Sequence, residues 1–170
     1  MRYLISALPR APGRVRLGTL NNLRWLAVVG QAVALLVVQL ALGFDFPLLL
    51  AAAPIAASAI LNIILALAYP ASKRLSAREA TGFLAYDIVQ LGALLFFTGG
   101  IENPFALLFV APVVISAATL DVLSTLFLGG LSFGAISFLW QAHFPLPWSP
   151  PNAFQLPALY QAGIWVSLLL

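Results

Sequence analysis

The chain has 170 residues, of which 62% are hydrophobic and 8% are charged, and its formal net charge is +3. Soluble domains usually carry about 25% charged residues, so this composition excludes an ordinary soluble fold and indicates a protein surrounded by lipid. The absence of cysteine excludes disulfides and thiolate metal sites, and one histidine is too few for a structural zinc site.

The N-terminal segment, residues 1–22, is predicted to be a basic arm, because it is rich in arginine and proline and has no apolar core. The first membrane span is predicted over residues 23–43, which is long enough to cross a hydrocarbon core, a distance of about 20 residues. Arg24 at its start is expected to extend toward the lipid head groups. Gln31 and Gln39 are costly in lipid, so we expect them to face other helices.

A second span is predicted over residues 47–69 and ends before Pro70. Within it, Asn62 offers a hydrogen bond to a neighbouring helix. Residues 71–80 follow with three basic side chains, and this segment is predicted to lie in water.

A third span, residues 81–97, contains Asp87 within its apolar run. A carboxylate there costs a few kcal/mol, so we expect it to face protein or a water-filled cavity. Gln90 follows three residues later and shares the same helix face, whereas Tyr86 is expected to point elsewhere. Asp87 and Gln90 are a possible secondary polar site, and the alternative is a structural buried contact.

The next segment is a short polar turn between two long apolar runs. Its two glycines allow positive φ and a tight reversal, and its proline suits the first turn of the following helix. The residues are Gly99-Gly100-Ile101-Glu102-Asn103-Pro104-Phe105. On these grounds alone, the segment is a turn that connects two helices.

Three more spans are predicted, over residues 105–119, 122–142 and 156–170. Asp121 is a candidate N-cap of the fifth, and Gly130 and Gly134 form a GxxxG pattern that permits close helix approach. Residues 143–155 are rich in proline and are predicted to be an external loop. The last span is marginal in length, so we expect the natural chain to continue. The fold class is therefore all-α, a polytopic membrane protein with six transmembrane helices.

The distribution of basic residues predicts the orientation. All eight lie in the N-terminal arm, at the start of the first span, or in the second connection. Two crossings separate these segments, so they share one side of the membrane, and the positive-inside rule makes that side the cytoplasm. Both termini are then cytoplasmic, the turn at residues 99–103 faces outward, and no nucleic-acid partner is expected.

The turn resembles the GGxxNPF heptapeptide of redox-responsive sensor histidine kinases of the RegB/PrrB/ActS family. The setting also matches, because the turn lies between the third and fourth of six spans. The start of the first span, Arg24-Trp25-Leu26-Ala27, is similar to the pattern that opens the family's first span. The resemblance covers essentially all 170 residues, as the membrane domain only.

The resemblance implies a six-helix sensor domain, residues 23–170, in the bacterial inner membrane. It implies ubiquinone as the sensed ligand, a homodimer, and control over autophosphorylation of a cytoplasmic histidine that then phosphorylates a response regulator. The phosphoacceptor and the kinase domain would lie beyond residue 170, so no catalytic residue and no metal is expected here. The heptapeptide positions that would bind quinone are Gly99, Gly100, Glu102, Asn103, Pro104 and Phe105.

A quinone head group needs hydrogen-bond donors for two carbonyl oxygens, an apolar slot and access to lipid. The Asn103 side chain and the backbone amides of Gly99 and Gly100 are candidate donors, and Phe96, Phe97 and Phe105 are candidates to pack on the ring. The alternative function is a transporter or channel fragment whose path is lined by Asp87, Gln90 and Asn62. The sequence that follows Leu170 would distinguish the two functions. A kinase domain there would indicate the sensor kinase, and further membrane spans would indicate the transporter.

Overall fold

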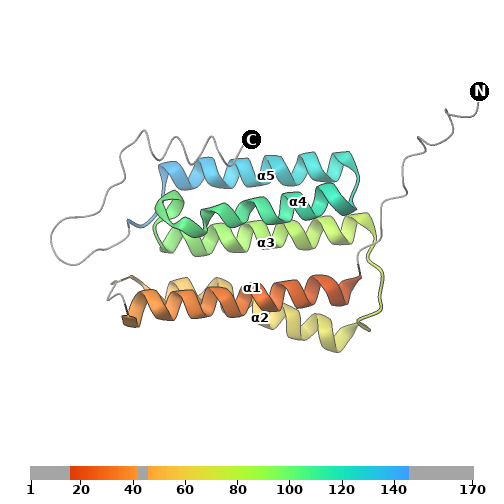
Figure 1. Ribbon diagram of the computed structural model, residues 1–170, viewed down its shortest axis with the longest axis horizontal. Helices are drawn as coiled ribbons and strands as arrows, with labels where there is room; N and C mark the ends of the chain where they lie inside the picture. The colour runs from red at the N-terminus through yellow and green to blue at the C-terminus, as the bar shows by residue number, and fades with distance from the viewer. Residues whose placement is uncertain (1–15, 42–45, 146–170) are drawn as a thin grey trace, which may run out of the picture.

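The computed structural model describes residues 16–41 and 46–145, which form an all-α bundle without β-strands in these ranges (Figure 1). The main helices are α1 (Leu17–Leu36), α2 (Leu48–Ala68), α3 (Ala77–Phe97), α4 (Val110–Thr119) and α5 (Val122–Gln141). A π-helical segment (Val37–Ala41) continues α1, and two 3₁₀ helices, η2 (Gly100–Glu102) and η3 (Pro104–Phe109), precede α4. The sixth predicted span, the loop over residues 146–155 and most of the N-terminal arm lie outside the described residues.

Four helical segments are long and apolar enough to cross a membrane: Leu17–Leu40, Leu48–Ala68, Ala77–Phe97 and Val122–Gln141. The span predicted over residues 105–119 differs from these, because Pro104–Thr119 is shorter and divides into η3 and α4. Asn103 is extended, and Pro104 follows it as the first residue of η3. The chain therefore leaves the turn through a 3₁₀ segment before it becomes α-helical.

Helices α1 and α3 begin earlier than predicted. The loop between α2 and α3 explains the early start of α1. The backbone N–H groups of Leu17 and Gly18 donate to the carbonyl oxygens of Lys73, at 2.9 Å, and Ala71, at 3.1 Å. These bonds satisfy donors that the first turn of α1 would otherwise leave unpaired. The start of α1 and the basic loop consequently lie side by side at one end of the bundle, opposite to the turn at residues 99–105 (Figure 1).

Two helix starts have clear side-chain caps. Ser76 accepts a hydrogen bond from the Glu79 backbone, and the Glu79 carboxylate accepts one in return from the Ser76 backbone, which forms a capping box at α3. Asp121 caps α5, as predicted, by accepting from the Ser124 backbone. Hydrogen bonds from the Ser124 side chain and backbone hold the pKa of Asp121 below its usual range.

The bundle has two layers of helices. Helix α1 packs on α2, whereas α3, α4 and α5 pack on one another, and α2 contacts α3 between the layers (Figure 1). The larger core cluster joins α3 to α5 through residues such as Leu95 and Leu128, and a smaller one joins α1 to α2 through Val28 and Ile55. Helices α1 and α3 also contribute to both clusters, through Leu20 and Leu84 in the larger one and through Leu35 and Leu94 in the smaller one.

The GxxxG pattern of α5 is not used for close packing within the described residues. A Cβ added at Gly130 or Gly134 would meet no atom within 4 Å. Helix α5 instead buries a different face, which carries Leu128, Ile136 and Leu139. The predicted close approach is therefore absent from this part of the chain, because larger apolar side chains make the contact.

Candidate functional site

The turn at residues 99–105 is held together by its own hydrogen bonds. Gly99 and Gly100 have φ values of 100° and 57°, so both glycines occupy the region that side chains disfavour. The Asn103 amide nitrogen donates to the Thr98 carbonyl oxygen at 2.9 Å and to the Thr98 hydroxyl at 3.1 Å. The Asn103 side-chain oxygen accepts from the Phe105 backbone at 2.9 Å. The side chain of Asn103 thus folds the turn from both sides.

His143, which follows the end of α5, packs against this turn. A Cβ added at Gly100 would lie 2.5 Å from Cγ of His143, so the glycine also makes room for the imidazole ring. His143 is itself fixed, because its Nδ1 lies 2.7 Å from the Leu139 carbonyl oxygen. Gly100 therefore has a structural reason to be glycine that requires no ligand.

A cleft of about 540 Å³ opens between α1, α3 and the turn. Its walls are almost wholly apolar. The rim includes Leu26 and Phe105, which are 72% and 44% exposed, so the cleft faces the side that lipid would occupy. The residues that line it are Leu23, Leu26, Ala27, Gly30, Gln31, Ala34, Leu35, Val38, Phe46, Leu91, Leu94, Leu95, Thr98, Asn103, Pro104, Phe105 and Leu108.

Only part of the predicted quinone site lines this cleft. Asn103, Pro104 and Phe105 do, whereas Gly99, Gly100 and Glu102 are not among the lining residues. The rings of Phe96 and Phe97 pack on Phe144 instead, with centroids 5.4 Å and 5.7 Å away. The structure therefore divides the heptapeptide into a half that shapes the turn and a half that borders the cleft.

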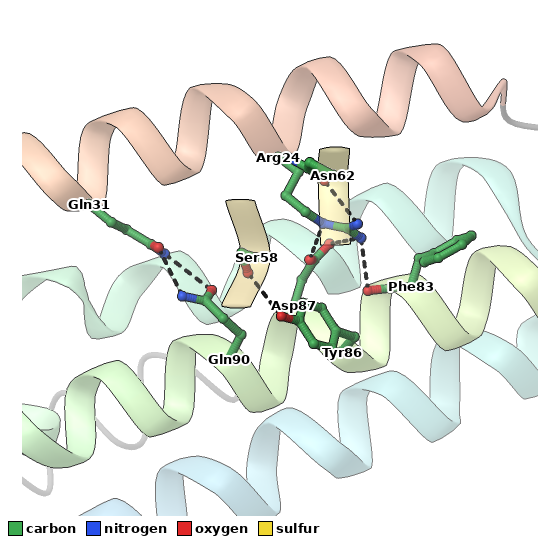
Figure 2. A network of polar contacts seen from close by, with 8 residues as sticks. All are labelled: Arg24, Gln31, Ser58, Asn62, Phe83, Tyr86, Asp87 and Gln90. Atoms are coloured by element: carbon green, nitrogen blue, oxygen red, sulfur yellow. Dashed lines mark hydrogen bonds and ion pairs between the residues drawn. The ribbon is translucent and has the colours of Figure 1, made fainter. Parts of the chain in front are cut away.

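A layer of polar side chains joins α1, α2 and α3 (Figure 2). Arg24 Nε lies 2.7 Å from Asp87 Oδ1, and Nη2 donates to Oδ2 at 3.2 Å. Nη1 donates to the Asn62 side-chain oxygen at 3.2 Å, and Nη2 also donates to the Phe83 carbonyl oxygen at 3.4 Å. A bidentate pair of this kind is among the stronger hydrogen-bonded arrangements in proteins.

The prediction that Arg24 extends toward the head groups is therefore wrong. The residue is 5% exposed. Because α1 begins at Leu17 and not at Leu23, Arg24 lies about two turns inside the helix, where Asp87 is its counter-ion. The sequence does carry a signal for this ion pair, because Arg24 and Asp87 are opposite charges that both lie inside apolar runs. Placing the helix start at Leu23 hid that signal, since it put Arg24 at the membrane surface.

Three further bonds extend the layer. Gln31 and Gln90 exchange side-chain hydrogen bonds, from Gln90 Nε2 to Gln31 Oε1 at 3.0 Å and from Gln31 Nε2 to Gln90 Oε1 at 3.5 Å (Figure 2). Asp87 and Gln90 share the face of α3 that meets α1, as expected. The Tyr86 hydroxyl, 3.3 Å from the Ser58 hydroxyl, also points into this layer. Tyr86 was expected to point elsewhere, but α1 and α2 together cover a face of α3 wide enough to include it.

The described residues contain no group of three or more His, Cys, Asp or Glu side chains that could hold a metal ion. Asn62, predicted as an interhelical contact and, in the alternative function, as a residue lining a path, makes an interhelical bond to Arg24. Arg24, Gln31, Ser58 and Tyr86 are members of the layer that the sequence did not mark as site residues. Gln31 is the one that also lines the cleft.

No protein-family model matches the chain, and no solved structure matches it. A curated relative, the sensor histidine kinase RegB of Cereibacter sphaeroides, is 39% identical over 155 residues, which is 91% of this chain and 34% of the relative. A second RegB, from a named strain of the same species, is 39% identical over 156 residues, or 92% of this chain and 34% of the relative. The chain thus spans about a third of the length of these relatives. The similarity over about nine-tenths of this chain, together with its long apolar helices, supports a membrane domain of the RegB type of sensor histidine kinase.

Proposed function

We propose that this chain is the input domain of a two-component sensor kinase and that it senses the redox state of ubiquinone in a bacterial inner membrane. It would control autophosphorylation of a cytoplasmic kinase domain, which then phosphorylates a response regulator. The observation that carries the proposal is the apolar cleft bordered by Asn103, Pro104 and Phe105 of the heptapeptide. Its dimensions, walls and opening each suit a quinone.

The volume of about 540 Å³ falls within the range of roughly 300–1,000 Å³ that small-molecule sites occupy. Apolar walls suit the quinone ring, and the Phe105 side chain lies at the rim, where it is positioned to pack on that ring. The exposed rim residues leave a path for an isoprenoid tail into the bilayer. A few polar groups among apolar walls are what fixes a ligand's orientation in such sites.

The cleft is also well placed to transmit a signal. It lies between α1 and α3, and the start of α1 is hydrogen-bonded to the basic loop at the opposite end of the bundle. By the positive-inside rule that end is cytoplasmic, with both termini on the same side. A ligand that binds better to one spacing of α1 and α3 would shift the population toward that spacing. In a homodimer, that change would reach the kinase domains.

The polar layer gives little support to the alternative function of a transporter or channel. Arg24 and Asp87 neutralise each other through two bonds, and Gln31 and Gln90 bond each other. These contacts pair the two charged side chains with each other and the two glutamines with each other. They favour a role in holding α1, α2 and α3 together.

The test is direct binding of a short-chain ubiquinone analogue to the 170-residue chain in lipid nanodiscs. Binding is measured by the quenching of tryptophan fluorescence. We expect saturable quenching by decylubiquinone and none by decylbenzene at the same membrane concentration, since decylbenzene shares the tail but has no carbonyl group. If a folded sample quenches equally with both compounds, or with neither, the proposal fails.

A further inference from the structure

The polar groups that line the cleft differ in how far protein contacts already occupy them. Three of the lining residues have polar side chains: Gln31, Thr98 and Asn103. The Thr98 hydroxyl donates to the Leu94 carbonyl oxygen at 2.9 Å and accepts from Asn103. The Asn103 amide uses its nitrogen for two bonds to Thr98 and its oxygen for one bond from Phe105. Both residues are therefore committed to the turn.

Gln31 is different. A glutamine side chain has two N–H donors and an oxygen that accepts up to two bonds. The oxygen of Gln31 is held at 3.0 Å by Gln90, but its nitrogen makes a single bond, to the Gln90 oxygen at 3.5 Å. That distance exceeds the 2.7–3.2 Å of ordinary N–H···O bonds. Among the side-chain donors of these three residues, the Gln31 amide nitrogen is the one that protein contacts hold most weakly.

We propose that Gln31 is the residue that donates a hydrogen bond to a carbonyl oxygen of the ligand in this cleft. The ligand class is a flat apolar molecule that carries a carbonyl group on its ring and an apolar tail. Gln90 bonds the Gln31 side chain across the helices but takes no part in the contact with the ligand. Asn103 acts on the ligand only by shaping the turn. This inference rests on the proposed quinone-sensing function and names the polar contact of the same site.

The role of Gln31 predicts a spectroscopic signature as well as an effect on affinity. A hydrogen bond lowers the stretching frequency of a quinone carbonyl group, which difference infrared spectroscopy detects with ¹³C-labelled decylubiquinone. Replacing Gln31 by Leu keeps the size of the side chain and removes the donor. We expect the Gln31→Leu variant to lose the frequency shift and to bind roughly 2- to 13-fold more weakly, the usual effect of one neutral hydrogen bond.

Two controls separate a ligand contact from a structural effect. Gln90→Leu breaks the same interhelical amide pair but leaves the Gln31 amide in the cleft, so the carbonyl shift should remain. Gln141→Leu makes the same chemical change at an exposed glutamine of α5, outside the cleft, and should alter neither the shift nor the affinity. If Gln90→Leu removes the shift as completely as Gln31→Leu, the direct role of Gln31 is excluded.

The outcomes also separate this inference from the function on which it rests. If the parent protein binds quinone with a shifted carbonyl and a folded Gln31→Leu variant keeps that shift, the donor is another group and quinone sensing stands. If the parent protein binds no quinone, both ideas fail. If Gln31→Leu does not fold, the parent protein is studied by solid-state NMR with ¹⁵N-labelled glutamine side chains and ¹³C-carbonyl quinone. A dipolar contact between the two labels is expected, and its absence overturns the inference.

Discussion

Arg24 on α1 and Asp87 on α3 form a bidentate ion pair, with nitrogen–oxygen distances of 2.7 Å and 3.2 Å, inside helices that are long and apolar enough to span a membrane. Their side chains are 4% and 26% exposed. This pair and the Gln31–Gln90 pair connect α1 to α3 alongside the apolar contacts of the two core clusters. Two of the contacts that hold the cleft walls are therefore polar, and they join residues 63 and 59 positions apart in the sequence.

Breaking the ion pair from one side should destabilise the bundle strongly. Arg24→Leu leaves a buried carboxylate without its counter-ion, a change that costs about 3–5 kcal/mol when a buried pair loses one partner. The double variant Arg24→Leu/Asp87→Leu should recover much of the loss, since neither charge remains. Thermal unfolding in detergent measures both, and a double variant less stable than either single variant would show that the pair does not act as a unit.

Asn103→Ala should lower stability because it removes the three bonds that fold the turn. Leaving the Thr98 carbonyl oxygen and the Phe105 N–H unpaired costs about 1–3 kcal/mol where they are buried. The Gln31→Leu variant provides the comparison, because its loss in quinone affinity should come without a defect in the turn. An Asn103→Ala protein with parental unfolding temperature and weakened quinone binding would instead assign Asn103 a direct ligand contact.

Gly100→Ala should be destabilising for two separable reasons. A side chain at φ +57° costs about 1–2 kcal/mol, and its Cβ would collide with His143. His143→Gly removes both the Cγ and the Cβ that an added Cβ would meet, so Gly100→Ala should cost less in the His143→Gly background than in the parent, and the cost that remains is the backbone part. Guanidinium or thermal unfolding of the single and double variants tests this, and an equal cost in both backgrounds would mean that the close contact with His143 is not what Gly100 provides.

The orientation in the membrane can be tested with single cysteines, since the chain has none of its own. Ser72 lies in the basic loop and Gln141 at the opposite end of the bundle, and both are exposed. We expect an impermeant thiol reagent applied to intact cells to label Gln141→Cys and not Ser72→Cys, and to label both after permeabilisation. Labelling of Ser72→Cys alone in intact cells would reverse the topology.

Much of the architecture could be predicted from the sequence, because continuous apolar runs of sufficient length form helices in lipid. The helix class, the Asp121 cap and the interhelical role of Asn62 follow from composition and local chemistry. The start of α1 could not be placed, because Asn21 and Asn22 look aqueous while the bonds to the α2–α3 loop that stabilise this turn are non-local. Because of that error, Arg24 was predicted at the lipid head groups and not in the interior of the bundle, where it lies.

The candidate site was only partly accessible from the sequence for a related reason. The turn could be located from its glycines and proline, and Asp87 and Gln90 were correctly placed on one helix face. Which side chains pair across helices depends on tertiary packing, so the partners of Asp87 and Gln90 on α1 were missed. The cleft itself depends on the spacing of α1 and α3, which no local pattern encodes.

The most direct test of the account is whether filling the cleft prevents quinone binding. Gly30 lines the cleft, and a Cβ added there meets no atom within 4 Å, so Gly30→Leu starts a side chain at the cleft wall from an unobstructed Cβ. Leucine also suits a helix better than glycine does, so the fold should be kept. Gly130→Leu is the matched control, because its added Cβ is equally unobstructed but lies on α5 outside the cleft.

The measurement is the affinity for decylubiquinone of the parent, Gly30→Leu and Gly130→Leu proteins in nanodiscs. The account predicts that Gly30→Leu weakens binding by roughly tenfold or more, equivalent to about 1.4 kcal/mol or more, and that Gly130→Leu binds like the parent. Equal affinity of all three proteins, each folded by circular dichroism, would contradict the claim that quinone occupies the cleft between α1, α3 and the Gly99–Phe105 turn.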